Sequence, residues 1–326
     1  MHSYGSDSQM FRSSSTKLKL GRSEREYGFE YKPRRSSREQ ARRINDLDFA
    51  DDIVLLENTI KLANEQLEQL RVEALKVGLE INEKKTEVMT FCCDHASTEP
   101  GKKGEVYLNG NELKRVDNFK YLGSMMKSSI SDFDCRRGLA WSAFRSMERI
   151  WRAKHIDLTL KVRIFEASVQ SVLLYGCESW VVDQKIESKI NTFATSCYRE
   201  LLGISRLDRV PNEQILAMVK RRPLINTVRS RQLGWLGHVM RRDETEPARI
   251  FALYTPEHGN SRRGRPRASY FHQIASLLTS SPASVTADNI AKLANNRKEW
   301  SKRTAAFQAN IDMGYHYLMV LKNHDF

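Results

Sequence analysis

The ten residues from Leu47 to Leu56 read "LDFADDIVLL" and place two adjacent carboxylates, Asp51 and Asp52, between apolar side chains. Two apolar runs separated by a short polar pair are typical of two strands joined by a tight turn, and aspartate favours turns. Because successive strand residues point to opposite faces, both carboxylates reach one site only if the chain bends between them. The sequence therefore predicts a β-hairpin with an acidic turn.

A helix and further strands are predicted after this hairpin. Apolar residues recur at spacings of three and four over residues 60–77, which predicts a helix. Asn58 is its predicted N-cap and Gly78 its predicted C-terminal stop. A strand is predicted over Lys85–Phe91, and Asn109-Gly110 between alternating runs predicts a second hairpin.

The remainder of the chain shows helical spacing. Three segments have an apolar stripe: Arg136–Ala153, Leu158–Tyr175 and Lys185–Leu202. We expect them to form a bundle in which the five tryptophans anchor the core. In the first segment the predicted buried face consists of Leu139, Ala143, Met147 and Ile150.

Charge is unevenly distributed along the chain. Its 326 residues include 53 Lys+Arg and 40 Asp+Glu, a net charge of +13. Residues 1–43 carry a net +6 and residues 220–267 a net +8, so the rest of the chain is nearly neutral. Two basic blocks favour a polyanionic partner, most commonly nucleic acid, although a solvated tail and a solvated helix face have the same composition.

Other compositional features limit the compartment. No apolar run approaches the roughly 18 residues of a membrane span, so we expect no membrane partner. The N-terminus has no apolar secretory core, and the five cysteines lack paired spacing, which favours reduced thiols and an intracellular protein, cytoplasmic or nuclear. Cys92, Cys93 and His95 have no second ligand pair, so they do not predict a zinc site. Oligomeric state is not predicted.

Several short motifs then point to one family. "FADD" at Phe49–Asp52 resembles the catalytic box of reverse transcriptases from non-LTR (LINE-type) retrotransposons. An acidic pair in a turn is common, but several motifs in the family's order are not. The motifs that follow and resemble the same elements are "GLEINEKKTEVM" (78–89), "FKYLGSMM" (119–126), "LLYGCESW" (173–180), "RELLGI" (199–204), "RQLGWLGHVMRR" (231–242) and "RRGRPR" (262–267).

The resemblance implies an α+β fold in which a partial polymerase palm, made of a β-hairpin, a helix and antiparallel strands, precedes an α-helical thumb-like region. The implied organisation is a disordered Ser/Arg-rich tail (1–43), the C-terminal part of the palm (44–130), the thumb-like region (131–220), and a basic post-thumb helical region with a C-terminal tail (221–326).

The resemblance also implies site residues. Asp51 and Asp52 would bind Mg²⁺, of which the intact family uses two ions in phosphoryl transfer. Lys85 would lie near the phosphates of the incoming nucleotide, with Lys84 as a competitor and a solvated lysine as the alternative. The implied primer grip is Phe119, Tyr121, Leu122 and Gly123, for which plain core packing is the alternative.

Part of the family's catalytic machinery has no counterpart in this sequence. In the family, the fingers and the first palm motifs, including a further metal-binding aspartate, come before the "FADD" box. Residues 1–48 carry no such pattern. We therefore expect a truncated RNA-directed DNA polymerase with an incomplete metal site. Such a chain would be unable to catalyse alone and would retain binding to a template–primer duplex of RNA or DNA.

Arginines would carry that binding. They border an apolar stripe over residues 221–242, which suits contact with a phosphate backbone. The alternative function is a DNA-binding protein whose "RRGRPR" segment enters an A·T-rich minor groove in the manner of an AT-hook. The candidate residues are Arg221, Arg222, Arg229, Arg231, Arg241, Arg242, Arg262, Arg263, Arg265 and Arg267.

Overall fold

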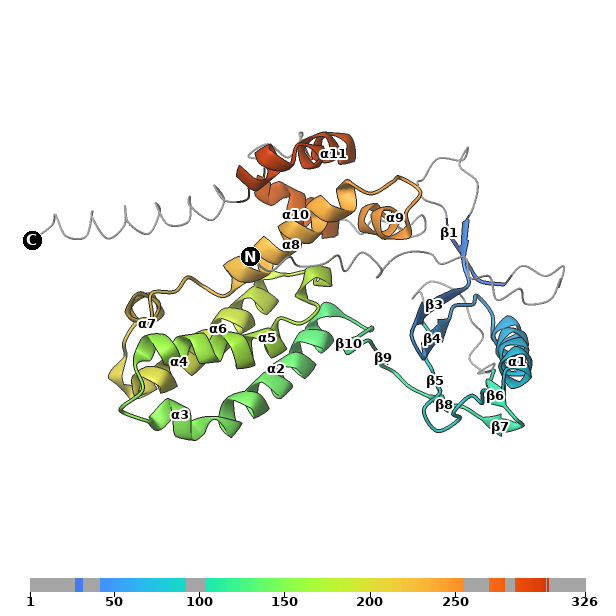
Figure 1. Cartoon of the computed structure of the whole chain (residues 1–326), viewed down its shortest axis with the longest axis horizontal. Coiled ribbons are helices and arrows are strands. Elements are labelled where there is room, and N and C mark those ends of the chain that lie inside the picture. Colours follow the sequence, from blue (N-terminus) through green and yellow to red (C-terminus); the bar gives the residue numbers. More distant parts are fainter. Residues whose placement is uncertain are drawn as a thin grey trace, which may run out of the picture. The chain divides into compact units, whose positions relative to one another are not determined.

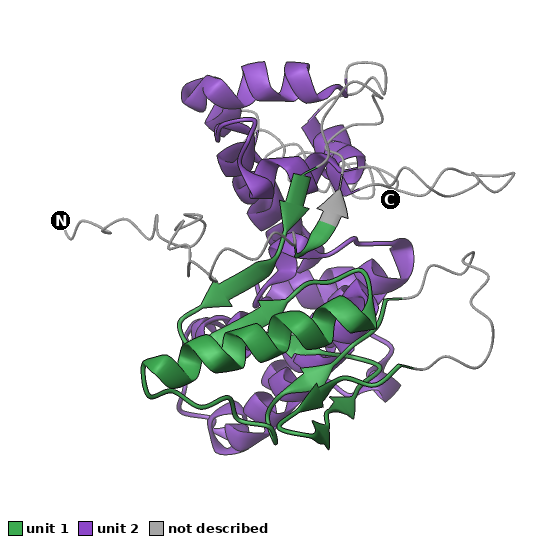
Figure 2. Cartoon of the chain, turned by 90° about the vertical axis from the view of Figure 1, so that its right-hand side faces the viewer, with its two compact units in different colours: residues 1–127 green, residues 128–326 purple. Residues whose placement is uncertain are grey.

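The computed structural model describes residues 27–31, 42–91, 104–254, 270–278, 285–302 and 304. The chain divides into two compact units, Met1–Lys127 and Ser128–Phe326, which Figure 2 colours green and purple. The predicted boundary between thumb and post-thumb at residue 220 therefore falls inside the second unit. Within the described ranges, no helix combines the length and apolar character that a bilayer crossing requires.

The first unit contains short paired strands and one long helix (Figure 1). The helix is α1, Ile60–Lys76. Four strand pairs are antiparallel: β1 (Phe29–Tyr31) with β2 (Arg42–Ile44), β3 (Asp46–Phe49) with β4 (Asp52–Leu55), β6 (Tyr107–Leu108) with β7 (Asn111–Glu112), and β9 (Lys120–Tyr121) with β10 (Ser124–Met125). One pair is parallel: β5 (Glu87–Val88) with β8 (Lys114–Arg115).

Most local predictions for this unit are confirmed, but the strand predicted over Lys85–Phe91 is too long, because β5 covers only Glu87–Val88. The acidic hairpin forms as β3 and β4, and Gly78 has the left-handed φ of 76° that suits a residue ending α1. The predicted cap is wrong, because the side chain of Thr59 caps α1 by accepting from the N–H of Leu62. Asn58 instead donates its side-chain amide to the carbonyl of Gly28 at 3.3 Å.

Part of the segment expected to be a disordered tail is ordered. Residues 29–31 and 42–44 pair as β1 and β2, Tyr27 is buried, and the N–H of Gly28 donates to Glu57 Oε1 at 2.8 Å. A composition averaged over residues 1–43 hides the aromatic stretch "YGFEY" at residues 27–31, in which Tyr27 supplies buried apolar surface.

The core of the first unit is small. Leu67 of α1 packs with Val106, Leu108 and Leu113, and partly buried apolar side chains surround them. The Asn109-Gly110 hairpin is confirmed, and both turn residues have positive φ, 51° and 80°, as a two-residue turn of this type requires.

The second unit is helical. In chain order its elements are α2 (Ser129–Ser146), α3 (Glu148–Arg152), α4 (Leu158–Phe165), the π-helical η1 (Glu166–Gln170), α5 (Ser171–Leu173), η2 (Cys177–Ser179), α6 (Gln184–Leu202), η3 (Arg206–Asp208), α7 (Asn212–Met218), α8 (Ile225–Met240), α9 (Pro247–Leu253), α10 (Tyr270–Ala275), η4 (Ser276–Leu278) and α11 (Ala287–Asn295). The predicted helices over 158–175 and 185–202 are confirmed.

The face predicted for the first helical segment is partly wrong. Leu139 is 45% exposed, whereas Phe133, Ala140 and Phe144 are buried in the core. The helix begins at Ser129, earlier than predicted, and its aromatic side chains contribute more apolar area to the core than a stripe of smaller residues would. Of the tryptophans expected in cores, Trp151, Trp180 and Trp300 are buried, and Trp141 and Trp235 are half-buried.

Helix α8 lies between two hydrophobic cores of this unit. Leu224, Ile225 and Val228 pack into the core formed with α2, α4 and α6, whereas Leu233 and Leu236 pack into the core formed with α10 and α11. The apolar stripe predicted for residues 221–242 is therefore confirmed as buried. Its residues are Leu224, Val228, Leu233, Leu236 and Val239.

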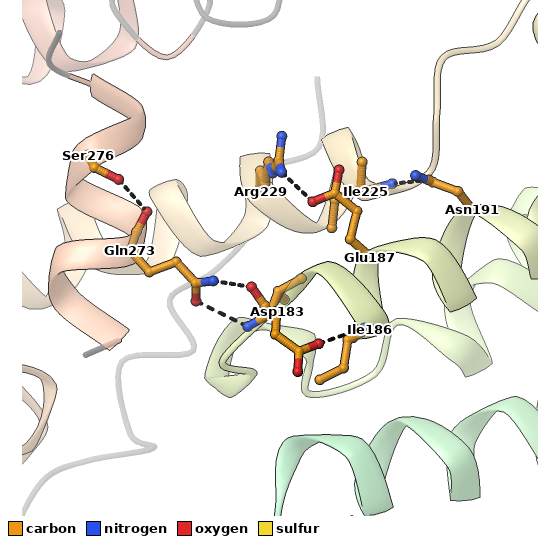
Figure 3. Close-up of polar contacts among 9 residues, drawn as sticks. Asp183, Ile186, Glu187, Asn191, Ile225, Arg229, Gln273 and Ser276 are labelled. Atoms are coloured by element: carbon orange, nitrogen blue, oxygen red, sulfur yellow. Dashed lines mark hydrogen bonds and ion pairs between the residues drawn. The ribbon is translucent and has the colours of Figure 1, made fainter. Parts of the chain in front are cut away.

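Polar contacts tie α8 and α10 to the α6 region (Figure 3). Arg229 of α8 forms an ion pair with Glu187 of α6 at 2.6 Å, and Asn191 accepts from the N–H of Ile225 at 3.1 Å. Gln273 of α10 bonds both backbone groups of Val182, just before α6. These bonds fix the arrangement of helices on which the arginines of α8 are displayed.

Close packing at Gly237 predicts a stability effect. A Cβ atom at this position would lie 2.5 Å from Cε2 and Nε1 of the buried Trp300, whereas a Cβ at Gly234 would meet nothing within 4 Å. We expect Gly237→Ala to lower the free energy of unfolding by about 2 kcal/mol through overpacking. The control Gly234→Ala should raise it by about 0.5–1 kcal/mol through helix propensity.

Denaturant unfolding followed by tryptophan fluorescence measures both effects, because all five tryptophans belong to the second unit. A Gly237→Ala protein as stable as the unmodified chain would contradict this packing of Trp300 against α8.

Candidate nucleic-acid and metal site

The acidic turn consists of two residues. Phe49 pairs with Asp52, so only Ala50 and Asp51 connect β3 to β4. Ala50 has a φ of 53°, a left-handed conformation that is costly for a residue with a Cβ. Asp51 and Asp52 are both exposed, so their carboxylates are accessible to a cation or a ligand.

The hairpin separates its aspartates onto two faces. Directly opposed residues share a face, so Asp52 lies on the side of Phe49, whereas Asp48 opposes Ile53 on the other side. Burial and the neighbouring Asp48 raise the pKa of Asp46 to about 6. Asp46 and Asp48 thus interact with each other rather than with Asp52.

The predicted primer-grip residues form a second tight turn. Leu122 and Gly123 connect β9 to β10 with φ values of 46° and 84°, and the N–H of Met126 donates to the carbonyl of Phe119 at 2.9 Å. The hydroxyl of Tyr121 donates to the carbonyl of Leu47 in β3 at 3.2 Å. This bond joins the two motif-bearing hairpins, which are about 70 residues apart in sequence.

The carboxylates of the acidic hairpin affect the pKa of Tyr121. Burial, Asp48 and Asp52 together raise the pKa of Tyr121 above its ordinary value. The phenol therefore lies within the field of the acidic hairpin and remains a hydrogen-bond donor at neutral pH.

Backbone strain distinguishes the two motif turns from the third hairpin of the unit. The Asn109-Gly110 turn uses residues that tolerate positive φ. Ala50 and Leu122 do not, and each is expected to cost about 1 kcal/mol or more. Strained positions of this kind are concentrated at functional sites, so their location in the two resembling motifs favours a functional role for both turns.

The structure does not place Lys85 in a specific contact. Its side chain is exposed in the turn before β5, and its N–H donates to the backbone carbonyl and the side chain of Asn82. Lys84 is also exposed. The role implied for Lys85 remains a prediction.

The acidic turn fits part of a magnesium site. Carboxylate oxygens suit Mg²⁺, which keeps several waters and is often held by one or two carboxylates together with phosphates. Among the described residues, however, no group of three or more His, Cys, Asp or Glu side chains is arranged to hold a metal ion. Asp51 and Asp52 could therefore hold one hydrated ion beside a phosphate, but they do not supply the ligands of a two-metal site.

The six described arginines of the candidate set have different environments. Arg221 pairs with Glu166 at 2.5 Å, which raises the pKa of Arg221, and Arg229 pairs with Glu187. Arg222 is half-buried, and Arg231 is exposed while donating one N–H to the carbonyl of Leu174 at 3.0 Å. Arg241 donates to the carbonyl of Ala294 at 3.2 Å, and Arg242 donates to His238 at 3.3 Å.

Two further basic residues near these arginines, His238 and Arg297, were not predicted. His238 of α8 contacts Arg242, and burial, Arg242, Arg241 and Arg297 lower the pKa of His238. Arg297 follows α11 in the segment "NNRKEW". Their proximity depends on the packing of α11 against α8, which the spacing of charges along the sequence does not reveal.

Some predicted residues lie outside the described part of the chain. They are Arg262, Arg263, Arg265 and Arg267 of the "RRGRPR" segment, and Cys92, Cys93 and His95.

Comparison with known proteins places the chain among transposon-related sequences. A family model described as a domain of unknown function (DUF6451) matches residues 143–175, from the end of α2 to just past α5. The chain is 28% identical over 275 residues to an uncharacterized transposon-derived protein of Caenorhabditis elegans, with 81% of this chain and 96% of that protein covered. No solved structure matches. The similarity supports a transposon-related origin.

The strain at Ala50 predicts that glycine would stabilise the acidic hairpin. We expect Ala50→Gly to raise local stability by about 1 kcal/mol, because glycine adopts a φ of 53° without a Cβ penalty. The control Ala63→Gly, inside α1, should lower local stability by about 1 kcal/mol.

Native-state hydrogen exchange of peptides covering residues 46–70 separates the two effects. Faster exchange of the hairpin in Ala50→Gly would contradict the turn geometry.

Proposed function

We propose that the chain derives from the palm and thumb of a non-LTR retrotransposon reverse transcriptase, an RNA-directed DNA polymerase. Its own activity, we infer, is binding of a template–primer duplex of RNA or DNA. The hydrogen bond from Tyr121 to Leu47 carries this proposal, because it brings the "FADD" and "FKYLG" turns together within one unit. The transposon-related origin and the order of the motifs support it.

Each part of the first unit has a role in this proposal. Asp51 and Asp52 bind Mg²⁺, which when bound neutralises phosphate charge at the end of the duplex. Phe119, Tyr121, Leu122 and Gly123 form the turn that contacts the primer strand. Lys85 contributes a cation near the same phosphates.

Binding is favoured over polymerisation for a chemical reason. Phosphoryl transfer by two metals requires ligands that hold both ions about 3.5–4 Å apart. Two adjacent carboxylates on an exposed turn, with no third acidic or imidazole ligand grouped with them among the described residues, give one ion at most a partial coordination shell. We therefore propose that the chain binds a template–primer duplex but does not extend the primer.

The second unit contributes the phosphate-backbone contacts. Arg231, Arg241 and Arg242 are the arginines proposed for this role, because the charges of Arg221 and Arg229 are already offset by carboxylates. Arg231 is exposed, donates one N–H to the carbonyl of Leu174 at 3.0 Å and also interacts with the thiol of Cys177. Backbone contacts of this kind give affinity without sequence preference.

Fluorescence anisotropy with a labelled RNA–DNA heteroduplex that has a recessed 3′ end tests the proposal. With about four phosphate contacts, Kd should rise on the order of 100-fold between 50 and 200 mM salt. Millimolar Mg²⁺ should tighten binding of the recessed end a few-fold, and Asp51→Asn with Asp52→Asn should abolish that gain while leaving the salt dependence unchanged.

Three results would count against the proposal. The first is an affinity that barely changes with salt. The second is RNA-templated incorporation of nucleotides that Asp51→Ala removes, since this would make the chain a polymerase. The third is a preference for A·T-rich over G·C-rich DNA that Arg265→Ala abolishes, since this would favour minor-groove binding.

A further inference from the structure

Three arginines and one histidine gather where the end of α8 meets the residues after α11. His238, Arg241 and Arg242 lie in or just beyond the last turn of α8, and Arg297 lies two residues after α11. The two elements are in close contact, as shown by Trp300 packing on Gly237 and by the arrangement of α8 and α11 in Figure 1. We refer to His238, Arg241, Arg242 and Arg297 as the α8-end cluster.

Hydrogen bonds hold the α8-end cluster together. Arg242 donates through Nε to His238 Nε2 at 3.3 Å, and its Nη2 lies 3.1 Å from the same ring nitrogen. Arg241 donates to the carbonyl of Ala294, three residues before Arg297. The carbonyl of Arg242 accepts from Arg249 at 2.7 Å. The cations are thus positioned by the fold.

The arginines of the α8-end cluster are not neutralised by an ion pair with any described carboxylate. Within the described ranges, no member of the cluster forms an ion pair, unlike Arg221 and Arg229 on the same part of the chain. Burial and Arg297 also lower the pKa of Arg241. The partial negative charge at the C-terminus of α8, about half an elementary charge, offsets only part of this repulsion. An anion between these groups would remove it.

We infer that the α8-end cluster binds a phosphate group of the nucleic-acid backbone, and that protonation of His238 strengthens this binding as the pH falls. The inference rests on the proposed function and adds a named phosphate site and a regulatory variable to it. Guanidinium groups suit this ligand because their planar N–H donors match phosphate oxygens and remain charged at all relevant pH values.

The direction in which binding affinity changes with pH follows from the coupling between phosphate binding and protonation of His238. Without a ligand, burial and the three surrounding arginines disfavour the protonated form of His238, so they lower its pKa. A bound phosphate offsets the field of the arginines and accepts the N–H groups that Arg242 otherwise donates to His238 Nε2, which frees this nitrogen to take up a proton. Binding therefore tightens as the pH falls from 8 to 6. Arg242, Arg241 and Arg297 act on His238, which is the histidine of the cluster and the side-chain type that titrates in this pH range.

Heteroduplex binding by four single variants of the full chain tests the site. Arg241→Gln and Arg297→Gln should each reduce the slope of log Kd against log salt by about one. Arg145→Gln, an exposed arginine in the last turn of α2, makes the same charge change elsewhere and should leave the slope unaltered. The unmodified chain should bind about fivefold tighter at pH 6 than at pH 8, and His238→Gln should lose this gain.

The outcomes separate this inference from the proposed function. If the unmodified chain binds with a steep salt dependence, but the cluster variants behave like Arg145→Gln, the cluster is not a binding site and the proposed function stands. If the chain does not bind duplex, histidine-selective NMR with inorganic phosphate examines the cluster alone. A His238 shift at millimolar phosphate would then overturn the nucleic-acid assignment in favour of a free anion, and no shift would overturn the site itself.

Discussion

Helix α8 has to be buried on more than one side, and the organisation of the second unit depends on this constraint. Its first half contributes to one hydrophobic core and its second half to another. Between the residues that enter the two cores, the buried amide of Gln232 donates to the carbonyls of Trp180 and Cys177 at 2.8 and 3.2 Å. This side chain supplies the hydrogen-bond donor that these two buried carbonyls need in place of water. Because so much of its surface is apolar, the arginines of α8 are confined to its borders. There some of them pair with carboxylates of neighbouring helices, and others remain with uncompensated charge.

The first unit differs from the second, because it combines a small apolar core with two turns in strained backbone conformations. Only a small apolar cluster holds its strands and α1 together. Even so, Ala50 and Leu122 keep left-handed backbone conformations in the two turns that the Tyr121 hydroxyl connects through Leu47. Glycine or asparagine would be easier to accommodate there, as the Asn109-Gly110 turn demonstrates. The proposed function explains this difference, since both turns would have to present defined surfaces to the end of a nucleic-acid duplex.

Local sequence patterns predicted the local structure of this protein well, and failed where packing between distant segments decides the outcome. The acidic hairpin, α1, the Asn109-Gly110 turn and the buried stripe of α8 follow from periodicity and turn chemistry. The face of α2 was misjudged because Phe133 packs edge-to-face on Trp180, a contact that no spacing within α2 indicates. In the candidate site, the sequence indicated Asp51, Asp52 and Tyr121 separately. Three features depend on tertiary contacts: the approach of Tyr121 to Asp52, the ion pairs that occupy Arg221 and Arg229, and the approach of Arg297 to His238.

The most direct test of the account is to locate the primer terminus on the protein. A template–primer duplex carrying a photoreactive base at the recessed 3′ end would be cross-linked to the full chain in Mg²⁺, and the modified peptides identified by mass spectrometry. The account predicts cross-links in the acidic hairpin, residues 46–55, or in the neighbouring turn, residues 119–126. A probe at an internal base pair should not give these products. Cross-links from the 3′ end that fall elsewhere, or that match those of the internal probe, would contradict the claim that the two turns form a primer-terminus site.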